Sequence, residues 1–155
     1  MADTQLPGYR YRGARILILL HERELRSCLA AWRRAKEAGI TLPQTDDPNY
    51  ESLHTLLLHI LRCPRSYMTW MTEKLGLPNP GIEQAPPVER IEQDAESFME
   101  HVLDRWRLPL KDVEEKRFDQ TYISQWGIQF SIESMLEHAV VHPMRHAAQL
   151  EALMP

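Results

Sequence analysis

Four stretches of the chain place apolar residues at every third or fourth position, the spacing of the buried face of an amphipathic helix. They predict helices over residues 14–38, from 48–51 to 75, from 87 or 88 to 107, and from 131 to 153. Gly39 and Gly76 suit C-terminal caps for the first two helices, and Ser131 suits the N-cap of the last.

The segments between these helices are rich in turn-forming residues. We expect an irregular arm over residues 1–13, a loop over 40–49 and a linker over 76–87. Residues 108–130 are the least regular, although Phe118, Tyr122 and Ile123 alternate as in a short extended segment. Four helices without a strong strand pattern predict an all-α four-helix bundle that forms one domain over residues 1–155.

The apolar stripe of each helix predicts which of its faces is buried. The first stripe comprises Ile16, Leu17, Leu20, Leu25, Cys28, Leu29 and Trp32, and the last comprises Ile132, Met135, Ala139, Leu150 and Leu153. Pro64 and Pro143 interrupt the second and fourth helices. Each should bend its helix, because proline removes one backbone donor and crowds the preceding turn.

Composition narrows the class of protein. Hydrophobic residues make up 43% of the 155 residues and charged residues 26%, as is ordinary for a globular protein. A formal net charge of −4 gives no basis for a nucleic-acid or membrane partner. The longest apolar run, Ile16–Leu20, is too short to span a bilayer, and the N-terminus lacks the pattern of a signal peptide. With only two cysteines, we expect a cytoplasmic protein with reduced thiols.

Three histidines follow one another at steps of four in the last predicted helix: His138, His142 and His146. At about 100° per residue, His142 and His146 fall on or beside the apolar stripe, whereas His138 points to a polar rim. In the second helix His59 lies at the edge of the stripe and His54 faces elsewhere. The second helix can therefore offer one inward imidazole to meet the pair on the fourth.

Three neutral imidazoles can hold a divalent ion and leave positions open for water or substrate, as in catalytic sites. The same residues are also compatible with hydrogen-bonded histidines of an ordinary core. Cys63, one turn after His59, could be a fourth ligand, a reactive thiol or a small apolar core residue. Gln149 could support a ligand or bind substrate, and Arg145 could orient ligands or lie on the surface.

The pattern His142-Pro-Met-Arg-His146-Ala-Ala-Gln149, with Leu-Leu-Leu-His59 in the second helix, resembles the DinB/YfiT-like superfamily. The resemblance covers residues 14–153. It implies an up-down-down-up bundle, a zinc or nickel ion on His59, His142 and His146, and a homodimer. The chain departs from the usual pattern at Pro143, which replaces a polar residue, and lacks the acidic residue that often follows the first ligand.

The resemblance also implies a reaction. We expect a metal-dependent enzyme in which the ion activates a thiol or water to attack a small electrophilic substrate. This is a thiol S-transferase-like or hydrolase-like activity, with a low-molecular-weight thiol as a possible cofactor. His138, Arg145 and Gln149 are the candidates for proton transfer and substrate orientation. The alternative is a non-catalytic, stress-responsive bundle in which the metal is structural.

Overall fold

The computed structural model describes residues 5–155, so the first four residues of the predicted N-terminal arm lie outside it. Its elements are α1 (Arg12–Glu37), the 3-10 turn η1 (Pro48–Tyr50), α2 (Leu53–Leu75), α3 (Ile91–Trp106), α4 (Glu115–Phe118), β1 (Thr121–Ile123), β2 (Gln129–Ser131) and α5 (Ile132–Leu153). The four long helices confirm the predicted all-α class.

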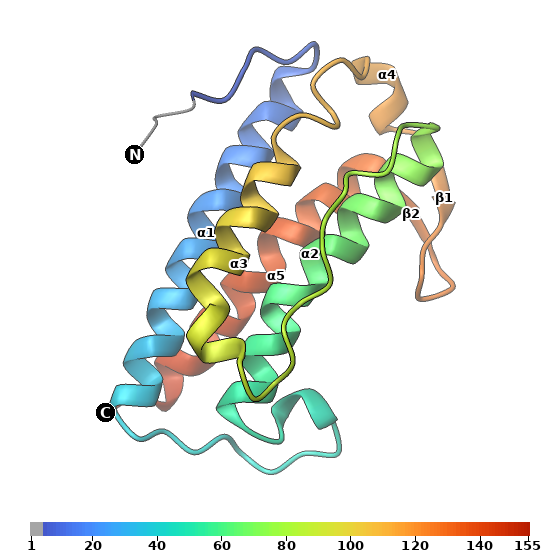
Figure 1. Cartoon of the computed structure of the whole chain (residues 1–155). Coiled ribbons are helices and arrows are strands. Elements are labelled where there is room, and N and C mark those ends of the chain that lie inside the picture. Colours follow the sequence, from blue (N-terminus) through green and yellow to red (C-terminus); the bar gives the residue numbers. More distant parts are fainter. Residues whose placement is uncertain (1–4) are drawn as a thin grey trace.

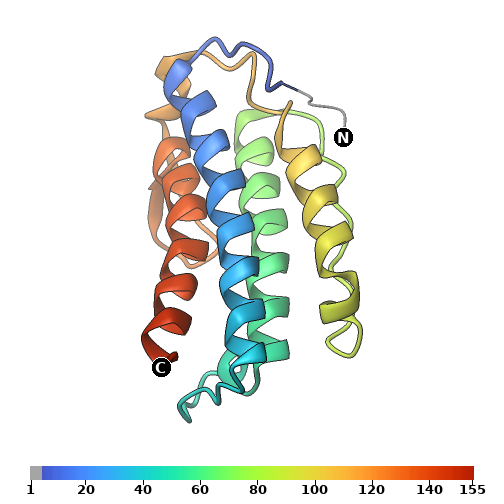
Figure 2. The same cartoon turned by 90° about the vertical axis from the view of Figure 1, so that its left-hand side faces the viewer.

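The long helices form a bundle with up-down-down-up topology (Figure 1). α1 runs parallel to α5 and packs along it, and α2 contacts both α3 and α5. The linker after α2 runs the length of the bundle before α3 begins, so α2 and α3 point the same way (Figures 1 and 2). This topology, which the family resemblance implied, places the N-terminal half of α2 opposite the C-terminal half of α5.

Local sequence signals set the helix ends. Ser52 and Ser131 each form a capping box with the residue three positions later, Thr55 and Ser134. Gly76 ends α2 in the left-handed conformation, with φ +68°. Both helices continue through their internal prolines. Two predicted starts were early, because residues 48–50 form a separate turn and residues 88–90 form a turn before α3.

The irregular region before α5 contains α4 and a two-stranded hairpin. β1 pairs antiparallel with β2, with Tyr122 opposite Phe130. Gly127 lies in the turn with φ +78°, a conformation that glycine adopts without strain. The extended segment expected around Tyr122 is therefore the first strand of this hairpin, which lies beside α2 and α5 (Figure 1).

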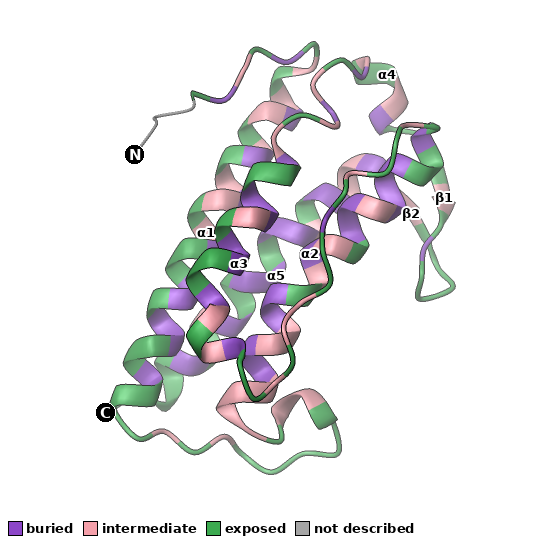
Figure 3. Ribbon diagram, in the orientation of Figure 1, coloured by how far each residue is buried: buried purple, intermediate pink, exposed green. Residues whose placement is uncertain are grey.

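The buried positions of the long helices face one another across the bundle (Figure 3). The stripe predicted for α1 was wrong at Ile16, which is 56% exposed, because Ile18 and His21 occupy the buried face instead. The ring of His21 stacks on Trp106 with centroids 3.8 Å apart. Neither of its ring nitrogens has a hydrogen-bond partner among residues 5–155.

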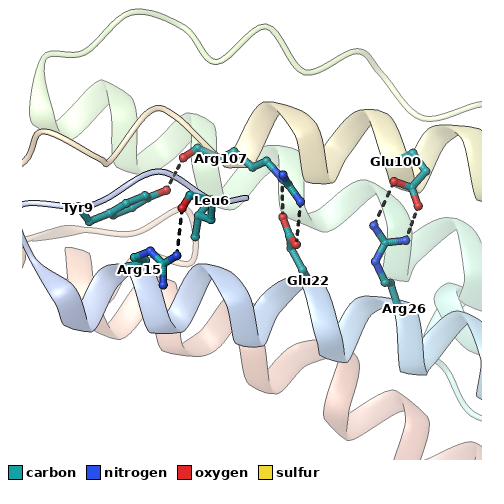
Figure 4. A network of polar contacts seen from close by, with 7 residues as sticks. All are labelled: Leu6, Tyr9, Arg15, Glu22, Arg26, Glu100 and Arg107. Carbon is teal, nitrogen blue, oxygen red and sulfur yellow. Dashed lines mark hydrogen bonds and ion pairs between the residues drawn. The ribbon is translucent and has the colours of Figure 1, made fainter. Parts of the chain in front are cut away.

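Polar contacts tie the N-terminal segment to α1 and α3 (Figure 4). The Arg107 guanidinium donates to Glu22 at 2.9 and 3.2 Å, and the hydroxyl of Tyr9 donates to the backbone carbonyl of Arg107. Arg15 donates to the carbonyl of Leu6 at 3.0 Å. Along the described part of the chain, no helix is long and apolar enough to cross a membrane.

Candidate metal centre

His59 of α2 meets His142 and His146 of α5 in the interior of the bundle. The Nε2 atoms of His59 and His142 are 2.9 Å apart, and those of His142 and His146 are 3.2 Å apart. His142 and His146 are only 6% and 3% exposed. Among residues 5–155 these three form the group of histidine, cysteine or acidic side chains that could hold a metal ion, with ligand atoms within 4.8 Å of one another.

The outward-facing nitrogens of two of these rings have their own partners. His146 Nδ1 lies 2.9 Å from Gln149 Oε1, and the Tyr50 hydroxyl donates to the same oxygen at 3.3 Å. His59 Nδ1 lies 3.5 Å from Cys63 Sγ. Contacts of this kind fix the orientation and tautomer of metal-binding histidines. Cys63 is thus on the opposite side of the His59 ring from the converging Nε2 atoms and supports that ring.

Burial keeps the three rings neutral. Burial first, and then the charges of His146 and Arg62, lower the pKa of His59 to about 4. Burial and the neighbouring His146 and His59 hold the pKa of His142 well below its usual value. The pKa of His146 is also lowered, chiefly by burial. Neutral imidazole is the form that coordinates a metal, so the site is ready for an ion at neutral pH.

The arrangement fits a divalent ion. Because Gln149 offers an oxygen acceptor to Nδ1 of His146, the proton of that ring sits on Nδ1 and the lone pair is on Nε2. Nitrogen lone pairs that converge in a buried space need a shared cation or proton. Two nitrogen ligands of a tetrahedral zinc ion lie about 3.3 Å apart. Two of the three observed separations, 2.9 and 3.2 Å, are close to that value, and all three atoms lie within 4.8 Å of one another.

His138 lies outside this group of three, as expected, but its surroundings differ from the expected polar rim. Its ring is half-buried among Tyr67, Trp126 and Phe130, with centroids 5.2, 4.9 and 5.9 Å away. The stacked ring of His142 lies 6.2 Å away. Burial and then the charge of Arg145 lower the pKa of His138. The hairpin causes this difference, because it folds back over the N-terminal half of α5.

The other two predicted site residues have different positions. Gln149 is exposed but contacts Nδ1 of His146, so it fixes the orientation of that ring. Arg145 is exposed, and its positive charge lowers the pKa of the nearby His138 and His146. His54 lies away from the site, where its Nε2 contacts Glu92 at 2.8 Å.

Sequence reasoning missed Tyr50 and the two hairpin aromatics, Trp126 and Phe130. Tyr50 lies in η1, and its position depends on how the loop before α2 folds back against α5. The signal for η1 was the Asp47-Pro48 pair, since Asp47 caps the turn by accepting from the backbone of Asn49 at 2.9 Å.

An up-down-down-up bundle with three histidines converging from facing helices defines a class of metal-binding helical proteins. The chain belongs to the DinB family, whose model matches residues 35–155 and therefore both helices that carry the three converging histidines. Comparison with curated proteins and with solved structures gave no match.

Proposed function

We propose that the protein is a divalent-metal-dependent enzyme that activates a thiol or water for attack on a small electrophilic substrate. The observation that carries this proposal is the convergence of three neutral imidazoles, two of them buried and His59 half-buried, without a fourth protein ligand in the described chain. Closed structural sites have four protein ligands, whereas catalytic sites keep a position for water or substrate. A zinc or nickel ion held by His59, His142 and His146 would lower the pKa of the thiol or water that it binds.

The chain's own residues supply the remaining parts. Gln149 and Cys63 hold the rings of His146 and His59 in place. His138 is neutral, and its ring nitrogens form no hydrogen bond with residues 5–155, so one of them can accept the proton of the nucleophile. Arg145, on the same side of α5, orients the substrate. Tyr67 and the hairpin aromatics exclude water from one side of the site.

The experiment uses tag-free protein loaded with zinc or nickel. Conjugation of glutathione to chlorodinitrobenzene tests the thiol reaction, and hydrolysis of nitrophenyl acetate tests the water reaction. We expect the metal-loaded protein to accelerate one of the two reactions above the rates of the apo protein and of free metal. The His142→Ala variant should show only the background rate. His54→Ala is the matched control and should retain the rate. Fully metal-loaded protein that accelerates neither reaction would contradict the proposal.

Cobalt(II) substitution separates this proposal from a structural metal. An open position predicts that added thiol changes the visible spectrum of the cobalt protein and adds a sulfur-to-cobalt charge-transfer band. A spectrum that no thiol, azide or cyanide alters would indicate a closed coordination sphere. That result would favour the alternative of a structural ion in a non-catalytic bundle.

We further propose that the enzyme acts in the cytoplasm as a homodimer. Both cysteines are free, which fits a reducing compartment. Exposed apolar side chains on α1 and α5, namely Ile16, Leu19, Val141 and Met144, could supply a dimer contact. Light scattering should give twice the chain mass of 18.2 kDa, and Ile16→Glu with Val141→Glu should restore the monomer. A wild-type mass of one chain at micromolar concentration would refute the dimer.

A further inference from the structure

A continuous series of aromatic rings leads from the hairpin to the histidine group. Trp126, in the turn of the hairpin, lies 4.9 Å from His138 and 5.3 Å from Phe130. Tyr67 of α2 lies 5.2 Å from His138 and 5.8 Å from His142. We call Tyr67, Trp126, Phe130 and His138 the aromatic wall. It lies beside the histidine group, on the side of the hairpin.

Trp126 differs from the other three tryptophans. Their indole N–H groups each donate to a backbone carbonyl, Trp32 to Leu53, Trp70 to Ile123 and Trp106 to Pro64. The Trp126 indole nitrogen has no hydrogen bond within the described chain, and the side chain is 47% exposed. An aromatic ring that is half exposed beside a polar site presents both a flat apolar face and a free donor.

Arg145 adds a positive charge next to this wall. It follows His138 by seven residues and His142 by three, so the three side chains share one face of α5. Arg145 is exposed, and no acidic group of residues 5–155 forms an ion pair with it. The other nearby cation, Arg62, donates to the neutral amide of Asn49 at 2.9 Å. Asp47, whose charge raises the pKa of His146, is the N-cap of η1 and so lies on the Tyr50 side of the site.

We propose that the aromatic wall and Arg145 form a substrate subsite for a small molecule that joins a planar apolar group to an anionic group. This inference rests on the proposed function, since it names the substrate class for the same centre. The planar group lies against the exposed ring of Trp126, and the anionic group meets the Arg145 guanidinium. A substrate held in this way lies beside His138, whose ring is 4.9 Å from that of Trp126 and which shares a helix face with Arg145.

The test uses naphthalenesulfonate as a probe, because a sulfonate is a weak ligand for zinc and its binding therefore reports the subsite. Proton–nitrogen NMR of the zinc-loaded protein resolves the four indole N–H signals. We expect the Trp126 signal to shift on titration while those of Trp32 and Trp106 stay in place. Naphthalenemethanol, the neutral analogue, should bind more weakly. Added salt should weaken the binding of the sulfonate and leave that of the neutral analogue unchanged.

Variants assign the two halves of the subsite. Trp126→Ala should lower the affinity for the probe at least about fivefold, and Arg145→Gln should lower it about threefold. Ile128→Ala is the matched control, since Ile128 is also an exposed apolar residue of the hairpin turn but has no place in the aromatic wall. Equal losses in Trp126→Ala and Ile128→Ala, or unchanged binding in Trp126→Ala, would overturn the apolar half. Equal affinity for the neutral analogue would overturn the anionic half.

Zinc content and cobalt spectra of the same samples keep the two proposals apart. A protein that holds zinc and reacts with thiols but ignores the probe would refute the subsite alone. A protein that binds the probe at Trp126 but carries no active ion would refute the proposed function and leave the subsite standing.

Discussion

His146→Ala is expected to abolish tight binding of a divalent ion. Two imidazoles then remain, from different helices, and a buried space replaces the third coordinating nitrogen. Loss of a residue that merely orients a metal ligand commonly costs 10–100-fold in affinity. We therefore expect loss of the ligand itself to cost more than roughly 100-fold. Competition of tag-free protein with a chromophoric chelator measures the effect.

Two control variants make this result specific. His54→Ala removes a histidine of α2 that contacts Glu92, and it should leave metal affinity unchanged. Gln149→Leu keeps all three ligands but removes the acceptor for His146 Nδ1, so its affinity should fall to an intermediate value. If His54→Ala and His146→Ala lowered the affinity for the ion equally, the ion would not bind at the group of His59, His142 and His146.

Acid should destabilise the protein, and the loss of stability should be smaller in the His21→Leu variant. Complete burial lowers the pKa of His21 to about 3 in the folded protein, against about 6.5 in an unfolded chain. Between these values the unfolded state binds a proton that the folded state cannot, so stability falls as the pH drops through this window. At pH 4.5 the contribution of His21 is on the order of 2–3 kcal/mol.

Urea denaturation at pH 7 and pH 4.5, with chelator present, measures this effect in both proteins. The histidines of the metal centre titrate in both, so the difference between the two proteins isolates His21. The substitution also removes two buried nitrogens that have no hydrogen-bond partner in the described chain. We therefore expect the His21→Leu variant to be at least as stable as the wild type at pH 7. Parallel losses of stability in the two proteins on acidification would contradict this prediction.

His21 also shows a limit of sequence reasoning. Residues 16–20 are uniformly apolar, so periodicity could not decide which of them face inward. The buried face passes through Ile18 and His21, and the polar character of histidine concealed it. By contrast, Gly76 and Ser131 carry local signals that fix helix ends, and the predicted ends at these residues agree with the structure.

The histidine group was predictable because it depends mainly on helix rotation. Spacing and apolar stripes turned His59, His142 and His146 inward, and the bundle brings them together. The aromatic wall was not predictable in the same way. The position of Trp126 depends on strand pairing within a region that lacks helical periodicity, and on packing between residues far apart in the chain.

The way the hairpin is attached has a consequence for access to the centre. Ser131 ends β2 and is also the N-cap of α5, so no hinge residue separates the hairpin from the helix that carries three of the histidines. The Trp70 indole ties the backbone of Ile123 to α2 at 3.0 Å. The hairpin therefore moves with α2 and α5 as one body. In the enzyme that we propose, entry of substrate should depend on rotation of the Trp126 side chain, over picoseconds to nanoseconds, instead of slow loop opening.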